Sequence, residues 1–209
     1  MSVFALVVAA IVGASSGPGE PSEEKWRRCI DGADEARIAG CEEIVGDTDF
    51  TRNARAFAAA TIGDIYLAQL RPAAAAGEFS RAIRLAPDYG YPYRRRGFAF
   101  FLTGRSDEAL ADYDSAIELS PLDPYAHVSR GSFFRQIGEL DRARADIEKA
   151  LELDLENSDL YYERGLLSLD VRDYQQAELD FTKSLLLKPD EHDARYNLVN
   201  ALRFQLRTE

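Results

Sequence analysis

Few residues in this sequence suit nucleic-acid binding or attachment to an anionic surface. The 25 Lys and Arg residues are outnumbered by 36 Asp and Glu residues, which gives a formal charge of -11. Because phosphate contacts need a clustered basic surface, this balance argues against nucleic-acid binding, and it disfavours anionic membranes. Hydrophobic residues make up 46% of the chain, which is enough to build a folded core.

Residues that typically carry chemistry are also scarce. There are two histidines, His127 and His192, and no serine motif accompanies either of them as a nucleophile would require. Two thiols and two distant histidines do not complete a zinc site. Acidic pairs such as Asp107 with Glu108 fall at expected helix starts, where carboxylates favour the helix dipole. We therefore expect no enzyme activity, no metal and no cofactor.

The most apolar run is short and lies at residues 3–14. It cannot span a bilayer as a helix, but it has the length of a signal-peptide core. Small and turn-forming residues follow, and Val12 and Ala14 are placed for cleavage after Ala14. No Lys or Arg precedes the run, so a short N-terminal anchor and a misassigned start stay open as alternatives.

We expect residues 1–14 to be a signal peptide and residues 15–21 to be a linker. The mature chain is then exported, to the periplasm or the extracellular space. A cytoplasmic or N-terminally membrane-anchored chain is the alternative.

Cysteine occurs only twice, as Cys29 and Cys41. In an exported protein an isolated pair on a short loop is typical of a disulfide. The separation of twelve residues suits two antiparallel helices joined by a turn at residues 32–34. A lipid anchor on Cys29 is not expected, because Trp26 and two arginines precede it where small apolar residues are needed.

What the sequence does contain is a repeat of 34 residues. Four glycines follow one another at this interval: Gly63, Gly97, Gly131 and Gly165. Twelve residues after each glycine stands an alanine: Ala75, Ala109, Ala143 and Ala177. Sixteen residues after each stands a large apolar residue: Phe79, Tyr113, Ile147 and Phe181. Small residues keep the same interval further on: Ala82, Ala116, Ala150 and Ser184. Parallel registers of this kind indicate internal repeats.

Each repeat predicts two helices. Ala109, Tyr113 and Ala116 follow the i, i+4, i+7 spacing of one buried helical stripe. Glycines end two of the first helices, at Gly104 and Gly138. Prolines follow the second helices, at Pro87, Pro121 and Pro189. Asp123 before Pro124 predicts a capped helix start.

A helix-turn-helix unit of 34 residues with small residues at its eighth, twentieth and twenty-seventh positions resembles the tetratricopeptide repeat (TPR) family. The resemblance implies an all-α fold, a right-handed superhelix of stacked antiparallel helix pairs known as a TPR solenoid. The repeats expected in this frame are 56–89, 90–123, 124–157 and 158–191. The departures from the family pattern are Ala59 and Ser168 at aromatic positions, Leu155 at the closing proline, and Ser184 at an alanine position.

The ends of a repeat array need caps. Residues 192–209 are expected to form a C-terminal capping helix, with Val199 where the repeats have glycine. Residues 22–55 are expected to form a degenerate N-terminal helix pair that the two cysteines tie together. Exported bacterial TPR proteins often open with a similar Cys-containing segment, and this chain resembles them.

In the TPR family the first helices line a concave groove. The resemblance therefore implies a peptide-binding groove formed by Tyr91, Arg94, Phe98, Phe101, Tyr125, Arg135, Tyr162 and Tyr196. Arg94 and Arg135 are suited to an acidic ligand group, whereas Arg95 and Arg96 are expected in solvent. The alternative is that the aromatic residues are core.

Some family members bind the C-terminal carboxylate of chaperones with a Lys and Asn clamp. Here Ala60 and Asp64 stand at the corresponding first pair of groove positions, so this clamp is absent. Two functions remain. The first is a non-catalytic protein- or peptide-binding scaffold in envelope or secretion assembly, and the alternative is a structural self-assembly module that forms a homo-oligomer.

Overall fold

The computed structural model describes residues 21–206 of the 209-residue chain, and these residues are helical throughout, joined by short turns. The predicted signal peptide at residues 1–14 lies outside the described residues. The helices are α2 (Pro21–Ile30), α3 (Asp34–Gly46), α4 (Arg52–Ala68), α5 (Pro72–Leu85), α6 (Gly90–Leu102), α7 (Ser106–Leu119), α8 (Pro124–Gln136), α9 (Leu140–Leu153), α10 (Ser158–Asp170), α11 (Tyr174–Leu187) and α12 (His192–Gln205). The all-α fold of stacked helix pairs is confirmed.

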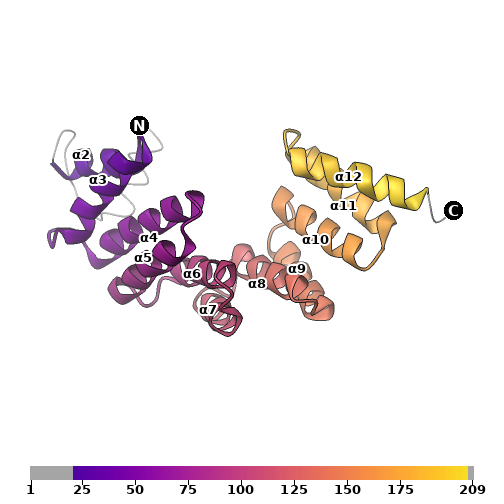
Figure 1. Ribbon diagram of the computed structural model, residues 1–209, viewed down its shortest axis with the longest axis horizontal. Helices are drawn as coiled ribbons and strands as arrows, with labels where there is room; N and C mark the ends of the chain where they lie inside the picture. The colour runs from indigo at the N-terminus through magenta and orange to yellow at the C-terminus, as the bar shows by residue number, and fades with distance from the viewer. Residues whose placement is uncertain (1–20, 207–209) are drawn as a thin grey trace. The chain divides into compact units, whose positions relative to one another are not determined.

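The chain divides between Leu119 and Ser120 into two compact units. Unit 1 contains α2 to α7, and unit 2 contains α8 to α12. Within each unit, consecutive helices pack as pairs: α2 with α3, α4 with α5, and α6 with α7 in unit 1, and α8 with α9 and α10 with α11 in unit 2 (Figure 1). The last helix, α12, packs against α11.

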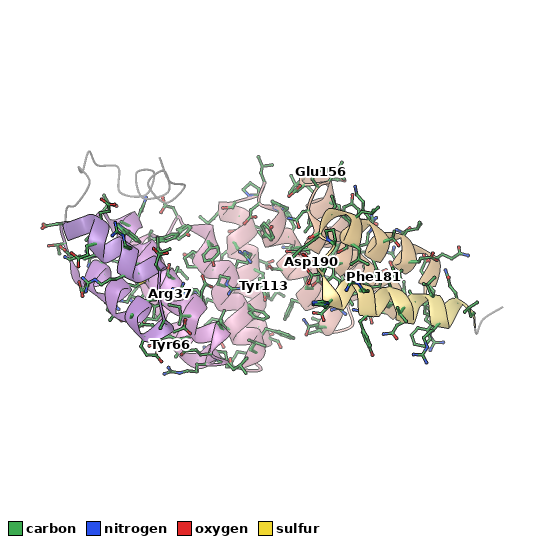
Figure 2. The ribbon with its side chains drawn as sticks, turned by 90° about the horizontal axis from the view of Figure 1, so that it is seen from above. Arg37, Tyr66, Tyr113, Glu156, Phe181 and Asp190 are labelled. Carbon is green, nitrogen blue, oxygen red and sulfur yellow. A yellow bond between two sulfur atoms is a disulfide. The ribbon has the colours of Figure 1, made fainter. Side chains whose placement is uncertain are left out.

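The repeated glycines mark the closest approach of the two helices of a pair. A Cβ atom on Gly63 would lie 2.6 Å from Cε1 of Phe79, and one on Gly165 would lie 2.6 Å from Cε1 of Phe181. Both phenylalanine rings are fully buried. Figure 2 shows Tyr113 and Phe181, each lying between helices of its own unit. The glycine and the large apolar residue sixteen positions later therefore form one packing contact, which explains their shared interval.

The turns inside the pairs also follow the 34-residue interval. Gly104 and Gly138 end α6 and α8 with φ of +77° and +83°. The residues at the same place after α4 and α10 are Leu70 and Arg172, with φ of 57° and 63°. These two adopt a left-handed conformation that favours glycine. Asp123 caps α8 as expected, with its Oδ1 accepting a hydrogen bond of 2.9 Å from the amide of Tyr125.

Unit 1 begins with a helix pair that is tied by the expected disulfide. Cys29 of α2 and Cys41 of α3 are bonded, and their Cα atoms lie 4.5 Å apart. Trp26 is 1% exposed, and its ring lies 6.1 Å from that of Phe50 and 5.8 Å from that of Phe57. In the chain-entropy model a loop of this length contributes about 3 kcal/mol. The disulfide thus holds a short pair whose α3 has few apolar contacts of its own.

Candidate peptide-binding surface of the first helices

In unit 1, Tyr91 is held by a polar cluster between α4 and α6. Its hydroxyl donates a hydrogen bond to Asp64 Oδ2, and Arg95 Nε donates to Asp64 Oδ1 at 2.6 Å. The ring of Tyr91 stacks on Tyr89 with centroids 5.9 Å apart. Burial, with Asp64 close by, raises the pKa of Tyr91 well above its usual value and that of Tyr89 to about 12. Both phenols therefore stay protonated at neutral pH.

The three consecutive arginines of α6 have different surroundings. The Arg94 guanidinium lies 5.1 Å from the centre of the Tyr91 ring. Arg95 pairs with Asp64, and Arg96 donates two hydrogen bonds, of 2.7 and 2.8 Å, to Asp112. The expectation that Arg95 and Arg96 lie in solvent is wrong. Each of them meets a carboxylate of another helix, because successive side chains of α6 point in directions about 100° apart.

The two predicted phenylalanines of α6 differ in exposure. Phe98 is 38% exposed, whereas Phe101 is half-buried. Phe98 is thus the predicted groove aromatic of unit 1 that presents most of its ring to solvent.

In unit 2, the three predicted tyrosines also differ. Tyr125 is 41% exposed, and its hydroxyl accepts a hydrogen bond of 2.9 Å from Asn157 Nδ2. Tyr162 is half-buried, with its ring 5.8 Å from that of Phe181, and burial raises the pKa of its phenol. Tyr196 of α12 is 69% exposed. Tyr125 and Tyr196 are therefore available to a ligand, and Tyr162 is mainly a packing residue.

Arg135 of α8 already faces two carboxylates of α10. Its Nη1 donates to Asp170 at 3.0 Å, and its Nε lies 3.9 Å from Glu163. Ser132 also donates to Glu163, at 2.8 Å. Burial raises the pKa of Glu163 in spite of these two partners. An acidic ligand group would have to compete with Asp170 for Arg135.

A set of ion pairs inside the helix pairs escaped the sequence analysis. Each joins an arginine just before the repeated glycine to a buried aspartate sixteen residues later, through two hydrogen bonds of 2.6 to 2.9 Å. The pairs are Arg96 with Asp112, Arg130 with Asp146, and Arg164 with Asp180. The signal was present, since the three arginines and the three aspartates each recur every 34 residues. These residues bind helix to helix, so they are not ligand groups.

His127 has a structural role of the same kind. Its Nε2 lies 3.0 Å from the carbonyl oxygen of Pro121. At the equivalent positions, the hydroxyl of Tyr93 donates to Pro87 and that of Tyr161 donates to Leu155, both at 3.2 Å. The histidine therefore replaces a tyrosine in a repeated contact that secures the start of the first helix.

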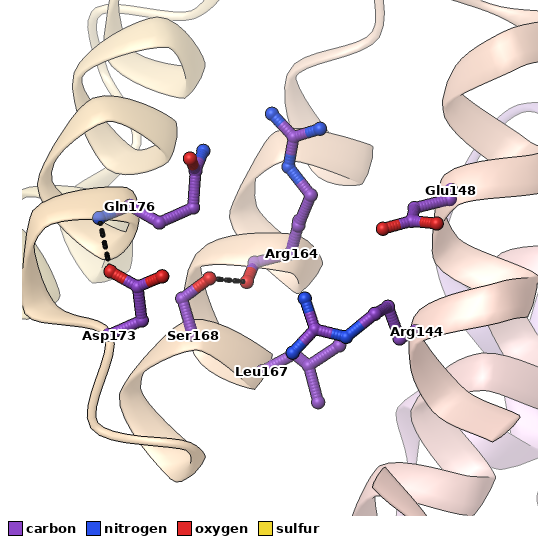
Figure 3. A pocket seen from close by; sticks show the side chains of 7 residues that line it. All are labelled: Arg144, Glu148, Arg164, Leu167, Ser168, Asp173 and Gln176. Carbon is purple, nitrogen blue, oxygen red and sulfur yellow. Dashed lines mark hydrogen bonds between the residues drawn. The ribbon is translucent and has the colours of Figure 1, made fainter. Parts of the chain in front are cut away.

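Unit 2 contains a pocket of about 160 Å³ (Figure 3). It is lined by Arg144, Glu148, Arg164, Leu167, Ser168, Asp173 and Gln176.

Ser168 explains why this pocket exists, because Phe100 and Phe134 stand at the equivalent positions of the two preceding pairs. Arg105 covers the Phe100 ring at 4.0 Å, and Arg142 covers the Phe134 ring at 3.8 Å. Ser168 instead donates a hydrogen bond to the carbonyl of Arg164. The short side chain leaves unfilled the space that a ring occupies elsewhere.

Two further findings bear on the kind of site. Residues 21–206 contain no group of three or more histidine, cysteine, aspartate or glutamate side chains placed to hold a metal ion. None of the described helices, α2 to α12, combines the length and the apolarity needed to cross a membrane.

Consecutive helix pairs with partly exposed aromatic rings on their first helices define a helical-repeat protein of the scaffold class. A family model described as tetratricopeptide repeat matches residues 60–124, 94–158 and 129–178, which together span more than half of the chain. The chain belongs to the tetratricopeptide repeat family. Proteins of this family are generally non-catalytic scaffolds.

Solved structures of TPR proteins share the fold at low sequence identity. A thermophilic TPR protein of Thermus thermophilus is 19% identical with a TM-score of 0.70, over 81% of this chain and 90% of that one. YrrB, described as a TPR protein with an unusual peptide-binding site, is 18% identical with a TM-score of 0.57, over 93% and 97%. The first TPR of Spaghetti (RPAP3), bound to the HSP90 peptide SRMEEVD, is 22% identical with a TM-score of 0.53, over 55% and 94%. No curated protein matches the chain.

Proposed function

We propose that the chain is a scaffold without chemistry of its own that binds a protein or peptide on the surface of its first helices. The observation that carries this proposal is the exposure of Phe98, Tyr125 and Tyr196, at 38%, 41% and 69%. Exposed aromatic residues are the type that dominates binding energy in protein interfaces. The other predicted groove aromatics, Tyr91, Phe101 and Tyr162, support this surface from beneath.

The similar structures support a peptide as the ligand, because two of them are described by the peptide or peptide-binding site that they contain. The mode of binding differs from a carboxylate clamp. In unit 1 the position for a clamp asparagine holds Asp64, whose two oxygens already accept from Tyr91 and Arg95. We therefore propose recognition of aromatic or apolar side chains within a peptide, with Arg94 as the cationic contact of unit 1.

The proposed setting is outside the cytoplasm, in assembly of an envelope or secretion complex. The disulfide between Cys29 and Cys41 supports an oxidising compartment, and the apolar run at residues 3–14 supports export. The resemblance to exported bacterial TPR proteins and the repeat boundaries at 56–89, 90–123, 124–157 and 158–191 belong to the same proposal. Intact-mass measurement of the chain from its native compartment tests the setting. A mass beginning at residue 15 supports it, and an unprocessed chain with two reactive thiols contradicts it.

The binding proposal is tested by selecting peptides from a random library on the full chain and titrating the selected peptide. In unit 1, Phe98→Ala and Arg94→Ala are compared, and in unit 2, Tyr125→Ala. Phe204→Ala is the matched control, since Phe204 is also 41% exposed but stacks on Tyr174, away from the predicted groove positions.

We expect at least one unit to lose about tenfold in affinity, which is 1.4 kcal/mol, with the melting temperature held within a few degrees. The control should bind as the wild type does. Unchanged affinity in all three test variants would move the site elsewhere, and loss of folding in all three would return these residues to the core.

The second candidate function is self-assembly. It is favoured by a specific observation on α12, where Val199 and Leu202 are 50% and 39% exposed, and by Leu206, which follows this helix and is 76% exposed. Exposed apolar residues that follow one helical stripe are typical of a helix with a partner.

A further inference from the structure

The helix α12 is a first helix that has no second helix packed on it in the described part of the chain. Its buried residues, Ala194 and Ala201, face the core of unit 2. On the opposite side lie Val199, Leu202 and Leu206, which we call the α12 stripe. In the preceding pair, the position equivalent to Val199 is Gly165, which Phe181 of the second helix covers.

The residue at the glycine position restricts what can cover the stripe. In the four full pairs a second helix approaches so closely that a Cβ atom would lie 2.6 to 3.0 Å from it. Val199 carries a branched side chain at this position, so a second helix of the repeat type cannot approach as it does elsewhere. A helix at an ordinary interaxial distance of about 8–10 Å can pack there.

The charges of α12 indicate which helix this is. Asp193 lies in the first turn, Arg203 lies in the last turn, and both are exposed. At 100° per residue they fall on the same flank of the stripe, at its two ends. A second copy of α12 in the antiparallel direction places Asp193 of each copy opposite Arg203 of the other. A two-fold axis makes this contact twice.

We propose that the α12 stripe binds the α12 stripe of a second copy of this chain, in antiparallel orientation. The apolar contact is made by Val199, Leu202 and Leu206 from both copies, and the two pairs of Asp193 with Arg203 set the direction. This proposal rests on the second candidate function, and it is independent of peptide binding by Phe98 and Tyr125.

Sedimentation equilibrium of the full chain over a range of concentrations tests the apolar contact. We expect the wild type to dimerise, and Leu206→Glu to raise the dimer Kd at least about tenfold. Leu155→Glu is the control, because Leu155 is 62% exposed in the α9 to α10 turn, away from the stripe. A wild type that is still monomeric at about 100 µM, or a dimer that Leu206→Glu leaves unchanged, overturns the proposal.

Charge reversal tests the orientation. Asp193→Arg and Arg203→Asp should each weaken the dimer, since each places like charges together twice. Mixing the two variants, or combining both changes in one chain, should restore the wild-type Kd. Failure of both restorations overturns the antiparallel pairing. Titration of the selected peptide into Leu206→Glu separates the two functions, because peptide binding should persist in that variant whether or not the dimer forms.

Discussion

At the scale of single residues, Glu163 links folding to pH. Its carboxylate is 25% exposed, and burial raises its pKa above the ordinary 4.5. The folded chain therefore binds this proton more tightly than the unfolded chain does. The stability contributed by the protonated carboxyl is fully present below about pH 4.5 and is lost as the pH rises through the raised pKa.

We expect Glu163→Gln to remove this dependence, because glutamine stays neutral and still accepts a hydrogen bond from Ser132. The free energy of unfolding of the wild type should fall relative to that of the variant as the pH rises from 4.5. Urea denaturation of both proteins between about pH 4 and pH 8 measures the difference. Parallel pH profiles would show that Glu163 ionises as freely in the folded chain as in the unfolded one.

Ser168 leaves the pocket of unit 2 unfilled, so Ser168→Phe should fill it. The new ring would lie where Phe100 and Phe134 lie in their own pairs, beside Arg164 as those rings lie beside Arg96 and Arg130. We expect the free energy of unfolding to rise by about 1 kcal/mol. Ser168→Ala, which keeps the pocket, is the control. A loss of stability in the phenylalanine variant alone would mean that the space does not match the ring.

The arginines of α6 show what a sequence reveals about single residues and what it does not. Helical geometry predicts that Arg94, Arg95 and Arg96 point in different directions. It does not reveal Asp64 or Asp112 as partners, because both lie on other helices. Tyr91 has the same difficulty, since its exposure depends on Tyr89 and Asp64 rather than on its own helix. The aromatic character of the surface was therefore predictable, but the exposed members were not.

At the scale of helices, the 34-residue interval is informative because each interval records a contact. Glycine followed by a large apolar residue sixteen positions later is the crossing of two helices, as Gly63 with Phe79 shows. Such contacts are local in sequence, so helix pairing could be predicted without a structure. The division between Leu119 and Ser120 could not, since Gly97 and Gly131 on either side of it keep the same interval.

Two glycines in different settings test this account. Gly165→Ala places a Cβ atom 2.6 Å from the buried ring of Phe181, so we expect a loss of about 1–3 kcal/mol. Gly77→Ala in α5 meets no atom within 4 Å, so the better helix former should add about 0.5–1 kcal/mol. Denaturant unfolding compares the two. A stabilising effect of both alanines would show that the α10 to α11 crossing has room for a methyl group.

At the scale of the whole molecule, stability is expected to be local. Each helix packs mainly on its neighbours in the sequence, which is the condition under which repeat proteins unfold segment by segment. The two compact units add a boundary to this pattern. Damage to the core of one unit should therefore leave the other folded.

Phe181→Ala tests this expectation in unit 2. The ring is fully buried and contacts Tyr162 and Gly165, so its removal should cost about 3–5 kcal/mol locally. Amide hydrogen exchange followed by mass spectrometry should show faster exchange in α10, α11 and α12. Peptides of α4 and α5 in unit 1 should exchange as in the wild type. Tyr113→Ala is the reciprocal control, since it removes a buried ring from unit 1 and should leave α10 and α11 protected. Equal loss of protection along the whole chain in both variants would mean that the two units unfold together as one cooperative body.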